Sequence, residues 1–531
     1  MGNTHFQERG NRPRVTRIPS DVGESYANKT PNFCNLRPLS LYAPSKKQKV
    51  EFFRKLNHIL RENTPHPPRP CPERLDMSPQ IRLGCLLIAL IGLTSFDSPR
   101  GVSAEPTPAV SWLNDRLTAV DRSFEAEKRD LVALYQHLHA NPELSLMEVK
   151  TAARLADELR KLGFEVTEKV GGTGVVGVIK NGPGPVVLVR TDMDALPVVE
   201  QTGLPYASKV RTKDLAGKEV GVMHACGHDI HMTSWVGTAR ALAANKDKWS
   251  GTLLMIAQPA EEIGAGAKAM LEDGLYQRFP KPDYAIALHT DPFAEFGSIS
   301  YAEGLTMANA DSVDILVKGR GGHGSAPHTT IDPIVLAARI ILDLQLIVSR
   351  ESNPVDPCVV TVGSIHGGTK HNIIPNEVQM QLTVRTTNNV SRDRVLRSID
   401  RIAKTAAQGA LAPEPEVKVH VIYTPATVND VALARRTAAV FRELLGEANV
   451  RIRQPLLGAE DFSRYAAEKT PIFMFFLGTM ARDRIEASKK EGAAPLPGWH
   501  SDSYAPSPEG SVQAGMRTLS LAAMDLLRKS K

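Results

Sequence analysis

Six short segments of this sequence hold side chains that can bind metal ions or transfer protons. They are 190–197 (RTDMDALP), 223–231 (MHACGHDIH), 258–262 (QPAEE), 287–290 (ALHT), the pair 319–328 (GRGGHGSAPH) and 371–375 (HNIIP), and 497–504 (PGWHSDSY). Together they offer thiol, imidazole and carboxylate groups, which zinc and manganese accept as ligands in proteins. A single histidine or aspartate is far more often a structural residue than a ligand. The segments therefore indicate a metal site only as a set that the fold brings together.

The elements that would position the first four segments are strands and helices in alternation. Apolar, β-branched runs predict strands at 164–170, 174–180, 185–192, 252–262 and 284–290, and helical periodicity occupies 124–142, 151–164, 235–246 and 265–277. This pattern predicts an α/β fold with a mainly parallel sheet and helices on both faces. Ligands of such sheets bind at the carboxyl ends of the strands. The polar segments follow the predicted strands, so we expect their side chains to meet there.

The pattern changes between 307 and 422. Strand, helix, strand, strand, helix and strand are predicted in turn at 310–319, 332–349, 357–365, 377–387, 391–409 and 416–422. This βαββαβ order is typical of a ferredoxin-like unit. After 424 the αβ pattern resumes, with a predicted strand at 472–478. We therefore expect one domain formed by 105–306 and 423–531, with a second domain, 307–422, inserted into it.

The first 104 residues are expected to stand apart from this fold. Residues 1–76 are rich in Arg and Pro and show no sustained periodicity, so we assign them no structure. They carry 14 Lys and Arg against 7 Asp and Glu, whereas the net charge of the whole chain is +6. The remainder is thus close to neutral, and its charge gives no argument for nucleic acid binding.

Residues 77–104 have the features of a signal peptide. The apolar run 83–93 is too short to span a bilayer of about 30 Å, Arg82 precedes it, and Val102 and Ala104 occupy the −3 and −1 positions of a cleavage site. We expect translation to start at Met77, cleavage between Ala104 and Glu105, and export to the periplasm or beyond. An ordinary buried helix is the alternative.

Composition excludes several classes of protein. With 531 residues, 42% hydrophobic and 23% charged, the chain is neither fibrous nor wholly disordered, and it is long enough for more than one domain. Of the five cysteines, only Cys226 and Cys358 follow the predicted cleavage site, so no disulfide framework is expected. Cys358, in the apolar context PCVVTV, is predicted to be a buried strand residue.

In this order, the motifs resemble those of one family. RTDMDALP, MHACGHDIH, QPAEE, ALHT, GGHGSAPH, GGTKHNIIP, VRTT, GAEDF and a late histidine follow one another along the chain. The sequence resembles the metallopeptidase-like amidohydrolases that include carboxypeptidase G and aminoacylase, in the branch of hippurate and auxin-conjugate hydrolases. The resemblance covers about 124–527. It implies a hydrolase that cleaves the amide bond of N-acyl amino acids or small peptides with a free carboxylate.

The resemblance also implies that 105–306 and 423–531 form the catalytic domain and hold a metal centre. The implied ligands of two divalent metal ions per subunit, zinc or manganese, are Cys226, His228, Glu262, His289 and His500. Glu261 would be the general base that accepts a proton from water. Asp194 would hold a ligand in orientation. Asp192, Asp229 and His231 have no settled role and are equally well explained as structural contacts.

The resemblance further implies that the inserted domain, 307–422, is a lid and dimerisation domain, which would complete the active site and, in much of the family, form a dimer. His323 would stabilise the oxyanion of the tetrahedral intermediate, with Asn372 nearby and His328 competing for this role. Arg385 would hold the free carboxylate of the substrate in a bidentate fork. The family often continues its last histidine as His-Ser-Pro or His-Thr-Pro, whereas here Ser501 and Asp502 follow. This departure leaves the histidine in place and changes the residues expected to form the adjacent pocket wall.

Other functions compete with this interpretation. The same residues would suit a carboxypeptidase or dipeptidase of the same fold. A non-catalytic binder of amino-acid conjugates is disfavoured because Glu261 and all five ligand positions are filled. A cysteine hydrolase with Cys226 as nucleophile and His228 as base has no specified oxyanion partner. The glycines around His323 could suggest a phosphate loop, but no Lys-Ser or Lys-Thr pair follows them.

Overall fold

The computed structural model describes residues 108–528 of the 531-residue chain. The predicted unstructured segment 1–76, the predicted signal peptide 77–104 and its cleavage site lie outside the described residues. Within 108–528, no helix is long and apolar enough to cross a membrane.

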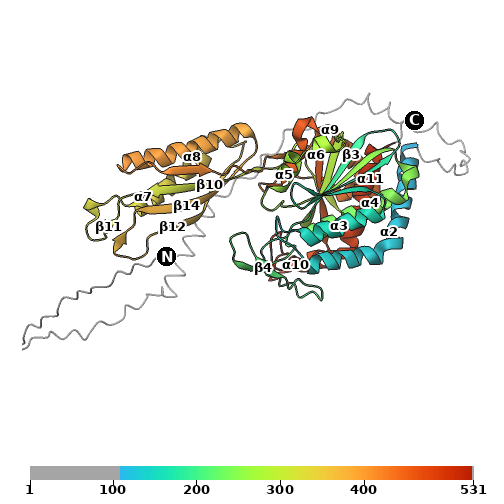
Figure 1. The fold of residues 1–531 in the computed structure, drawn as a ribbon, viewed down its shortest axis with the longest axis horizontal. Coiled ribbons are helices and arrows are strands. Elements are labelled where there is room, and N and C mark those ends of the chain that lie inside the picture. Colours follow the sequence, from blue (N-terminus) through green and yellow to red (C-terminus); the bar gives the residue numbers. More distant parts are fainter. Residues whose placement is uncertain (1–107, 529–531) are drawn as a thin grey trace, which may run out of the picture. The chain divides into compact units, whose positions relative to one another are not determined.

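The catalytic domain is built on an eight-stranded sheet with the order β1-β2-β6-β3-β7-β18-β8-β17 (Figure 1). The strands are β1 (Glu165–Val170), β2 (Gly174–Asn181), β3 (Val186–Asp192), β6 (Gly251–Gln258), β7 (Tyr284–Glu295), β8 (Ile299–Tyr301), β17 (Val450–Ile452) and β18 (Ile472–Met480). The central strands β6, β3, β7 and β18 are parallel. The mainly parallel α/β sheet is thus confirmed, with β1 and β2 added antiparallel at one edge.

Helices cover both faces of this sheet because its strands bury side chains on both sides. Val187 and Val189 of β3 pack into one core, and Leu188 between them packs into the other. The first core lies against α2 (Pro108–Ala140), α3 (Val149–Lys161), α4 (His228–Ala244), α9 (Val431–Leu445) and α11 (Pro508–Leu526). The second lies against α5 (Gly266–Glu272), α6 (Leu275–Arg278) and the 3₁₀ segment η5 (Asp461–Lys469).

The lid domain has the predicted ferredoxin-like order. It consists of β10 (Asn309–Lys318), α7 (Pro333–Leu346), β12 (Val359–Gly367), β14 (Glu377–Thr386), α8 (Asn389–Gly409) and β15 (Glu416–Val419), with the sheet order β12-β14-β10-β15. Both helices pack on one face, where a separate core forms. Along β14 buried and more exposed residues alternate, so only one face of the lid sheet is covered. A small ribbon, β11 (Gly322–His323) with β13 (Ile373–Ile374), follows at one end.

The remaining elements are short. The two connections between the domains pair with each other through β9 (Leu305–Met307) and β16 (Thr427–Val428). A hairpin forms from β4 (Arg211–Lys213) and β5 (Glu219–Gly221), and α10 (Arg482–Ser488) follows β18.

Two elements extend beyond the predicted ranges. The helix predicted at 124–142 begins at Pro108, because apolar residues such as Leu113 and Val120 continue its buried stripe. β7 does not end near His289 but runs on to Glu295, where it pairs with Met480 of β18. His289 therefore lies in the middle of a strand rather than near its end. Cys358 is buried immediately before β12, with its thiol close to the Ser352 hydroxyl.

Candidate metal centre

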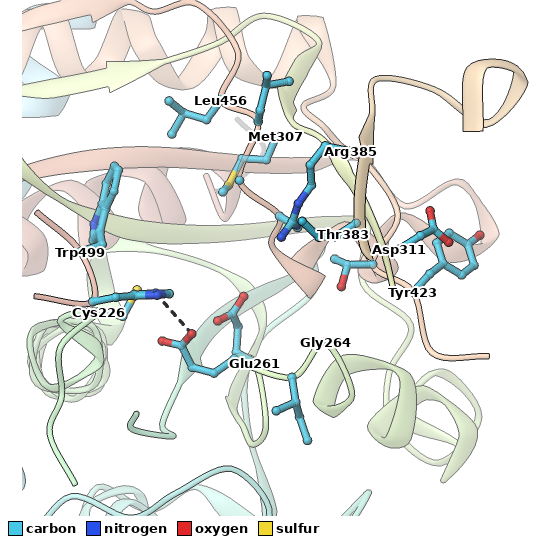
Figure 2. Close-up of a pocket in the computed structure, with 18 of the residues that line it drawn as sticks. Cys226, Glu261, Gly264, Met307, Asp311, Thr383, Arg385, Tyr423, Leu456 and Trp499 are labelled. Atoms are coloured by element: carbon cyan, nitrogen blue, oxygen red, sulfur yellow. Dashed lines mark ion pairs between the residues drawn. The ribbon is translucent and has the colours of Figure 1, made fainter. Parts of the chain in front are cut away.

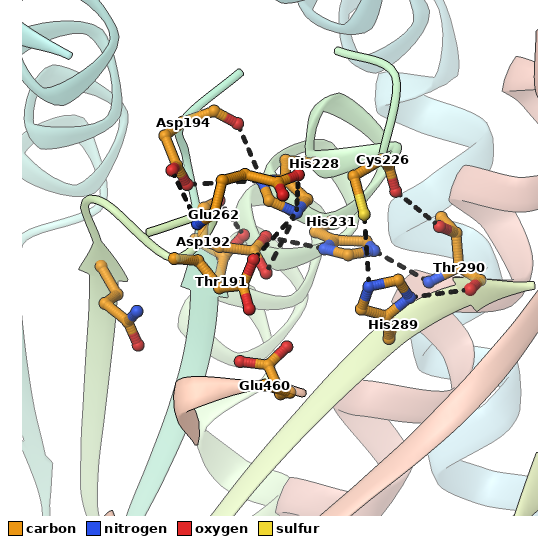
Figure 3. Close-up of polar contacts among 12 residues, drawn as sticks. Thr191, Asp192, Asp194, Cys226, His228, His231, Glu262, His289, Thr290 and Glu460 are labelled. Atoms are coloured by element: carbon orange, nitrogen blue, oxygen red, sulfur yellow. Dashed lines mark hydrogen bonds and ion pairs between the residues drawn. The ribbon is translucent and has the colours of Figure 1, made fainter. Parts of the chain in front are cut away.

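The structure brings the five predicted ligands and Glu261 into one cluster. Three overlapping groups, each with its ligand atoms within 4.8 Å of one another, are Cys226 with His228 and His289, Cys226 with Glu262 and His500, and His228 with Glu261 and Glu262. His289 lies in β7, His228 begins α4 and Cys226 lies just before it (Figure 3). Glu261 and Glu262 follow β6, and His500 lies in the loop before α11. Residues far apart in sequence thus converge near the carboxyl ends of the parallel strands.

The loop that carries Cys226 and His228 requires a glycine between them. Gly227 has a φ of +83°, which favours glycine. A Cβ at this position would lie 2.8 Å from the Thr290 hydroxyl oxygen. The tight turn starts α4 at His228, so that cysteine and histidine face the same side. In the C-G-H tripeptide, the backbone conformation therefore requires the glycine, and the cysteine and histidine supply ligand atoms.

Two histidines are oriented by hydrogen bonds to backbone carbonyls. His228 Nδ1 donates to Asp194 O at 2.8 Å, and His289 Nδ1 donates to Thr290 O at 2.8 Å. These bonds favour the tautomer with a free lone pair on Nε2. His289 Nε2 lies 3.5 Å from Cys226 Sγ, and His228 Nε2 has no hydrogen-bond partner within 108–528. Nε2 of each ring is thereby directed into the cluster, where burial lowers the pKa of His228 but Asp192 and Asp194 raise it to about 10 in the absence of a cation.

The turn after β6 gives Glu261 and Glu262 different surroundings. Ala260 has a φ of +52°, a left-handed conformation that costs a non-glycine residue roughly 1–2 kcal/mol. Glu262 Oε2 lies 3.4 Å from His500 Nε2, whereas Glu261 Oε2 lies 3.9 Å from His228 Nε2. The left-handed residue allows neighbouring carboxylates to serve different purposes in one site.

The charges in the cluster fit divalent cations. Burial, together with the Glu460 and Glu262 carboxylates, raises the pKa of Glu261 well above its ordinary value. Burial also raises the pKa of Glu262 to about 8, although His228 opposes the shift. The buried Oε1 of Glu262 and the Nε2 of His228 both lack hydrogen-bond partners in the described chain. Divalent cations would stabilise these crowded anions and satisfy both orphaned atoms.

Cys226 has the wrong environment for a nucleophile. Burial and the nearby Glu262 and Glu261 carboxylates raise the pKa of its thiol well above the ordinary value. The reactive form of cysteine is the thiolate, which requires an electropositive setting. Bound cations would deprotonate the thiol and use it as a ligand. The geometry thus favours the metal-ligand role of Cys226 over the cysteine-hydrolase interpretation.

Asp194 links both halves of the cluster. One of its carboxylate oxygens, Oδ2, accepts hydrogen bonds from Ser145 Oγ at 2.6 Å and from the backbone N of Glu262 at 3.0 Å. Its backbone oxygen is the acceptor that orients His228. Asp194 therefore has the contacts expected of the predicted supporting residue.

Asp192 and His231 form a chain of hydrogen bonds that ends on β7, the strand that carries His289. His231 Nδ1 donates to Asp192 Oδ1 at 2.7 Å, and His231 Nε2 accepts from the backbone N of Thr290 at 2.8 Å. Because both ring nitrogens of His231 are engaged by protein groups, neither is available to a metal ion. These two residues are structural contacts beneath the cluster.

Asp229 belongs to a second buried network. Its Oδ2 lies 2.6 Å from Nδ1 of His139, whose Nε2 lies 3.0 Å from Oε1 of Glu200. Burial alone would lower the pKa of His139, but hydrogen bonds to Asp229 and Glu200 raise it to about 10. Asp229 thus pairs with a buried imidazolium, and no sequence motif marked His139 for this role.

The GAEDF motif surrounds a buried arginine. Arg190 contacts Asp192 at 2.6 Å, Glu460 at 2.7 Å and Asp461 at 3.3 Å, and it is fully buried. Three carboxylates around one guanidinium leave excess negative charge beside Glu261, which groups with Glu460 and Asp461. The GAEDF motif belongs to the family resemblance, but its order and spacing predicted no role for Glu460 or Asp461.

A pocket of about 720 Å³ opens beside the cluster. Its walls include cluster residues Cys226, Glu261 and Glu262 together with Arg385 of β14, which points into the pocket (Figure 2). Apolar side chains that sequence reasoning did not identify line it as well: Ile263, Met307, Ile422, Leu456, Leu457, Phe476 and Trp499. Their spacing in sequence is irregular, so only the assembled fold could reveal this wall.

The predicted lid residues other than Arg385 do not line this pocket. His323 is exposed on β11, and Asn372 precedes β13, where its backbone oxygen accepts a hydrogen bond from Gly324 N at 2.9 Å. The structure therefore places His323 and Asn372 next to each other. His328 is exposed in a 3₁₀ turn nearby and also lies outside the pocket.

Comparisons with known proteins agree with this arrangement. A family model described as Peptidase family M20/M25/M40 matches residues 188–494. Thermostable carboxypeptidase 2 of Saccharolobus solfataricus is 41% identical over 66% of this chain and 86% of that protein, and hippurate hydrolase of Campylobacter jejuni is 41% identical over 64% and 85%. The Bacillus subtilis YXEP structure, described as a dinuclear metal binding peptidase, has a TM-score of 0.61 and 31% identity, covering 76% of this chain and 99% of that one. This chain therefore belongs to peptidase family M20/M25/M40.

Proposed function

We propose that this protein hydrolyses the amide bond of N-acyl amino acids whose carboxylate is free. The observation that carries the proposal is one pocket with two features: a cluster of metal-binding side chains and an arginine without a partner. The guanidinium of Arg385 makes no hydrogen bond or ion pair with any residue of 108–528, and it lines the same pocket as Glu261. Because both features line one pocket, they suit a substrate that carries an amide and a free carboxylate.

Arg385 is free because its acidic neighbour is already engaged. Asp311 accepts hydrogen bonds from Arg392 Nη2 at 2.6 Å and Nε at 2.9 Å. Burial lowers the pKa of Arg385, although Asp311 opposes the shift, and the guanidinium stays charged at any working pH. A half-buried cation that lacks a protein anion is suited to a bidentate contact with a substrate carboxylate.

The cluster supports hydrolysis by water. Two divalent cations, when bound, lower the pKa of a shared water and polarise the scissile carbonyl. Cys226, His228, Glu262, His289 and His500 would hold them. Glu261 would accept a proton from the attacking water and pass it to the leaving nitrogen. The thiolate favours zinc by its softness, while the oxygen and nitrogen donors also accept manganese.

A substrate screen tests this proposal. N-benzoyl, N-acetyl and indole-acetyl amino acids and a set of dipeptides would be assayed while metal content is measured by mass spectrometry. We expect hydrolysis of N-acyl amino acids, loss of activity with a chelator, and recovery with Zn²⁺ or Mn²⁺. Preference for peptides would favour the carboxypeptidase alternative, which the name of one relative suggests. Activity that resists a chelator but is abolished by thiol alkylation would indicate a cysteine hydrolase. Binding of these compounds without turnover would indicate a non-catalytic binder.

Arg385→Ala should raise KM for carboxylate substrates by about 10- to 100-fold, because a charge-assisted hydrogen-bond pair contributes about 1.5–3 kcal/mol. kcat should change less. An amide analogue of the same substrate lacks the charge and should be hydrolysed equally well by both proteins. Arg397→Ala removes an exposed lid arginine on α8 and serves as the control. An equal loss with both substrates would place carboxylate recognition elsewhere.

We further propose that the working enzyme is a homodimer in which His323 serves the partner's site. Arg385 pairs with Ala310 near the start of β10, whereas the β11 ribbon follows Lys318 at its end. These positions are eight residues apart, or roughly 27 Å at about 3.4 Å per residue. Arg385 and His323 of the same chain are therefore too far apart to contact one small substrate.

The lid also carries a surface that suits a second copy of the chain. Val335, Leu342 and Leu346 form an apolar stripe on α7 and are 66%, 71% and 47% exposed. β12 is an edge strand of the lid sheet, and an edge strand offers unpaired backbone groups to a partner. The apolar stripe and the open edge strand together support association through the lid, which complementation of variants tests.

A further inference from the structure

Glu148 is a fully buried carboxylate that contacts the turn after β6 from a distant part of the sequence. Its side chain lies immediately before α3 and is 0% exposed. Oε1 accepts hydrogen bonds from Ala260 N at 2.8 Å and from Leu146 N at 2.9 Å, and Oε2 accepts one from Thr173 Oγ1 at 2.7 Å. The carboxylate thus accepts three hydrogen bonds, and the donor of one of them, Ala260 N, belongs to the turn after β6.

Capping of α3 does not explain these contacts. Glu148 is the N-cap residue of α3, but its side chain makes no capping hydrogen bond. Glu143 Oε2 instead accepts from Lys150 N at 2.9 Å and from Thr151 N at 2.8 Å. Because Glu143 satisfies the first amides of the helix, the Glu148 carboxylate is available for another purpose.

No cation neutralises Glu148 within the described chain. Burial, followed by the negative charge of Asp194, raises the pKa of Glu148 to about 6, and hydrogen bonds from Thr173 and Ala260 oppose the shift. A carboxylate buried without a counterion is unfavourable unless its oxygens are fully hydrogen-bonded. The three hydrogen-bond donors are therefore the groups that compensate for the burial of this carboxylate.

Ala260 is the residue on which the direction of the turn depends. It adopts the left-handed conformation, and its carbonyl oxygen accepts from Ala265 N at 3.1 Å and Gly266 N at 3.2 Å. Its amide is held by Glu148. A strained residue persists only when its surroundings fix it from several sides. Release of the amide would allow the peptide to relax and rotate the residues that follow.

We propose that Glu148 is a positioning residue that holds the Ala260 amide and thereby aims Glu261 and Glu262 at the metal cluster. This inference rests on the proposed function, in which Glu261 is the general base. Glu148 itself lines no part of the pocket and touches neither substrate nor metal. A displacement of about 1 Å at a reacting group lowers rates by about 100-fold, so a residue that fixes this turn has a large effect from a distance.

Three variants of the full chain test the proposal. Glu148→Ala should lower kcat about 10- to 100-fold with little change in KM. Glu148→Gln should retain near-normal kcat, because its amide oxygen still accepts from Ala260 and its amide nitrogen donates to Thr173. Glu148→Asp keeps the charge but is one methylene shorter, so it should lose activity like Glu148→Ala. If the alanine variant does not fold, the kcat of the aspartate variant still tests the proposal.

Hydrogen exchange without substrate gives a second measurement. The amide of Ala260, followed by mass spectrometry in peptides that span 258–264, should exchange faster in the alanine and aspartate variants and at the normal rate in the glutamine variant. This result does not depend on the reaction. Failure to find hydrolysis in the substrate screen would therefore refute the proposed function and leave the Ala260 contact to be judged by exchange alone.

Glu158→Ala is the matched control. Glu158 is a buried carboxylate on α3, which bonds to Arg240 and Lys161 rather than to the turn. It should lower the melting temperature without lowering kcat. The proposal is overturned if Glu158→Ala loses as much kcat as Glu148→Ala, if Glu148→Gln is as inactive as Glu148→Ala, or if exchange of Ala260 is unchanged in the alanine and aspartate variants.

Discussion

Replacement of Glu261 with glutamine is expected to lower kcat by about two to four orders of magnitude, the usual contribution of a general base. Metal content and melting temperature should stay nearly unchanged. Glu261 groups with His228 and Glu262 on one side and with the Glu460 and Asp461 carboxylates on the other. A carboxylate among other anions, at the rim of the ligand set, is placed to accept a proton rather than to hold a cation.

Glu262→Gln should have the opposite effect. Glu262 groups with Cys226 and His500 on one side and with His228 on the other, so the loss of its charge should remove metal. We expect a lower metal stoichiometry by mass spectrometry, with part of the activity restored by excess metal. Full metal content in Glu262→Gln together with loss of metal in Glu261→Gln would exchange the two roles.

A second large effect is expected from pairs of variants. His323→Ala and Glu261→Gln should each be nearly inactive, the first because an oxyanion donor contributes about 10²–10³ to kcat. In a mixed dimer, one site combines the intact Glu261 of one chain with the intact His323 of the other. Co-expressed chains with different affinity tags, purified through both, should thus regain about half of the wild-type activity, since one of two symmetric sites works.

Arg385→Ala provides the matched control for this experiment. Arg385 lines the pocket of its own chain, so a mixed dimer of Arg385→Ala and Glu261→Gln has no complete site. At substrate concentrations below KM, this pair should show no recovery beyond the activity of the Arg385→Ala chain. If the His323 pair also fails to recover in a dimer verified by light scattering, His323 would act within its own chain or not at all.

Much of the architecture could be predicted because local periodicity and global fold agree. The alternation of apolar residues in 377–387 predicted β14 almost to the residue, since one face of the lid sheet is buried and the other is not. The helix predicted at 391–409 appears as α8 for the same reason. Where the pattern was mixed, as beyond His289, strand pairing with β18 extended the element further than its own residues indicated.

The sequence by itself determined which side chains are available: the types, order and spacing of Cys226, His228 and the Glu261–Glu262 pair were enough to predict a metal cluster and the family. Only the tertiary structure decided how each is used. The left-handed Ala260 and its contact with Glu148 join segments 112 residues apart, and the engagement of both nitrogens removes His231 from the ligand set. Such roles depend on hydrogen bonds between distant segments, and these bonds exist only once the sheet has brought the strand ends together.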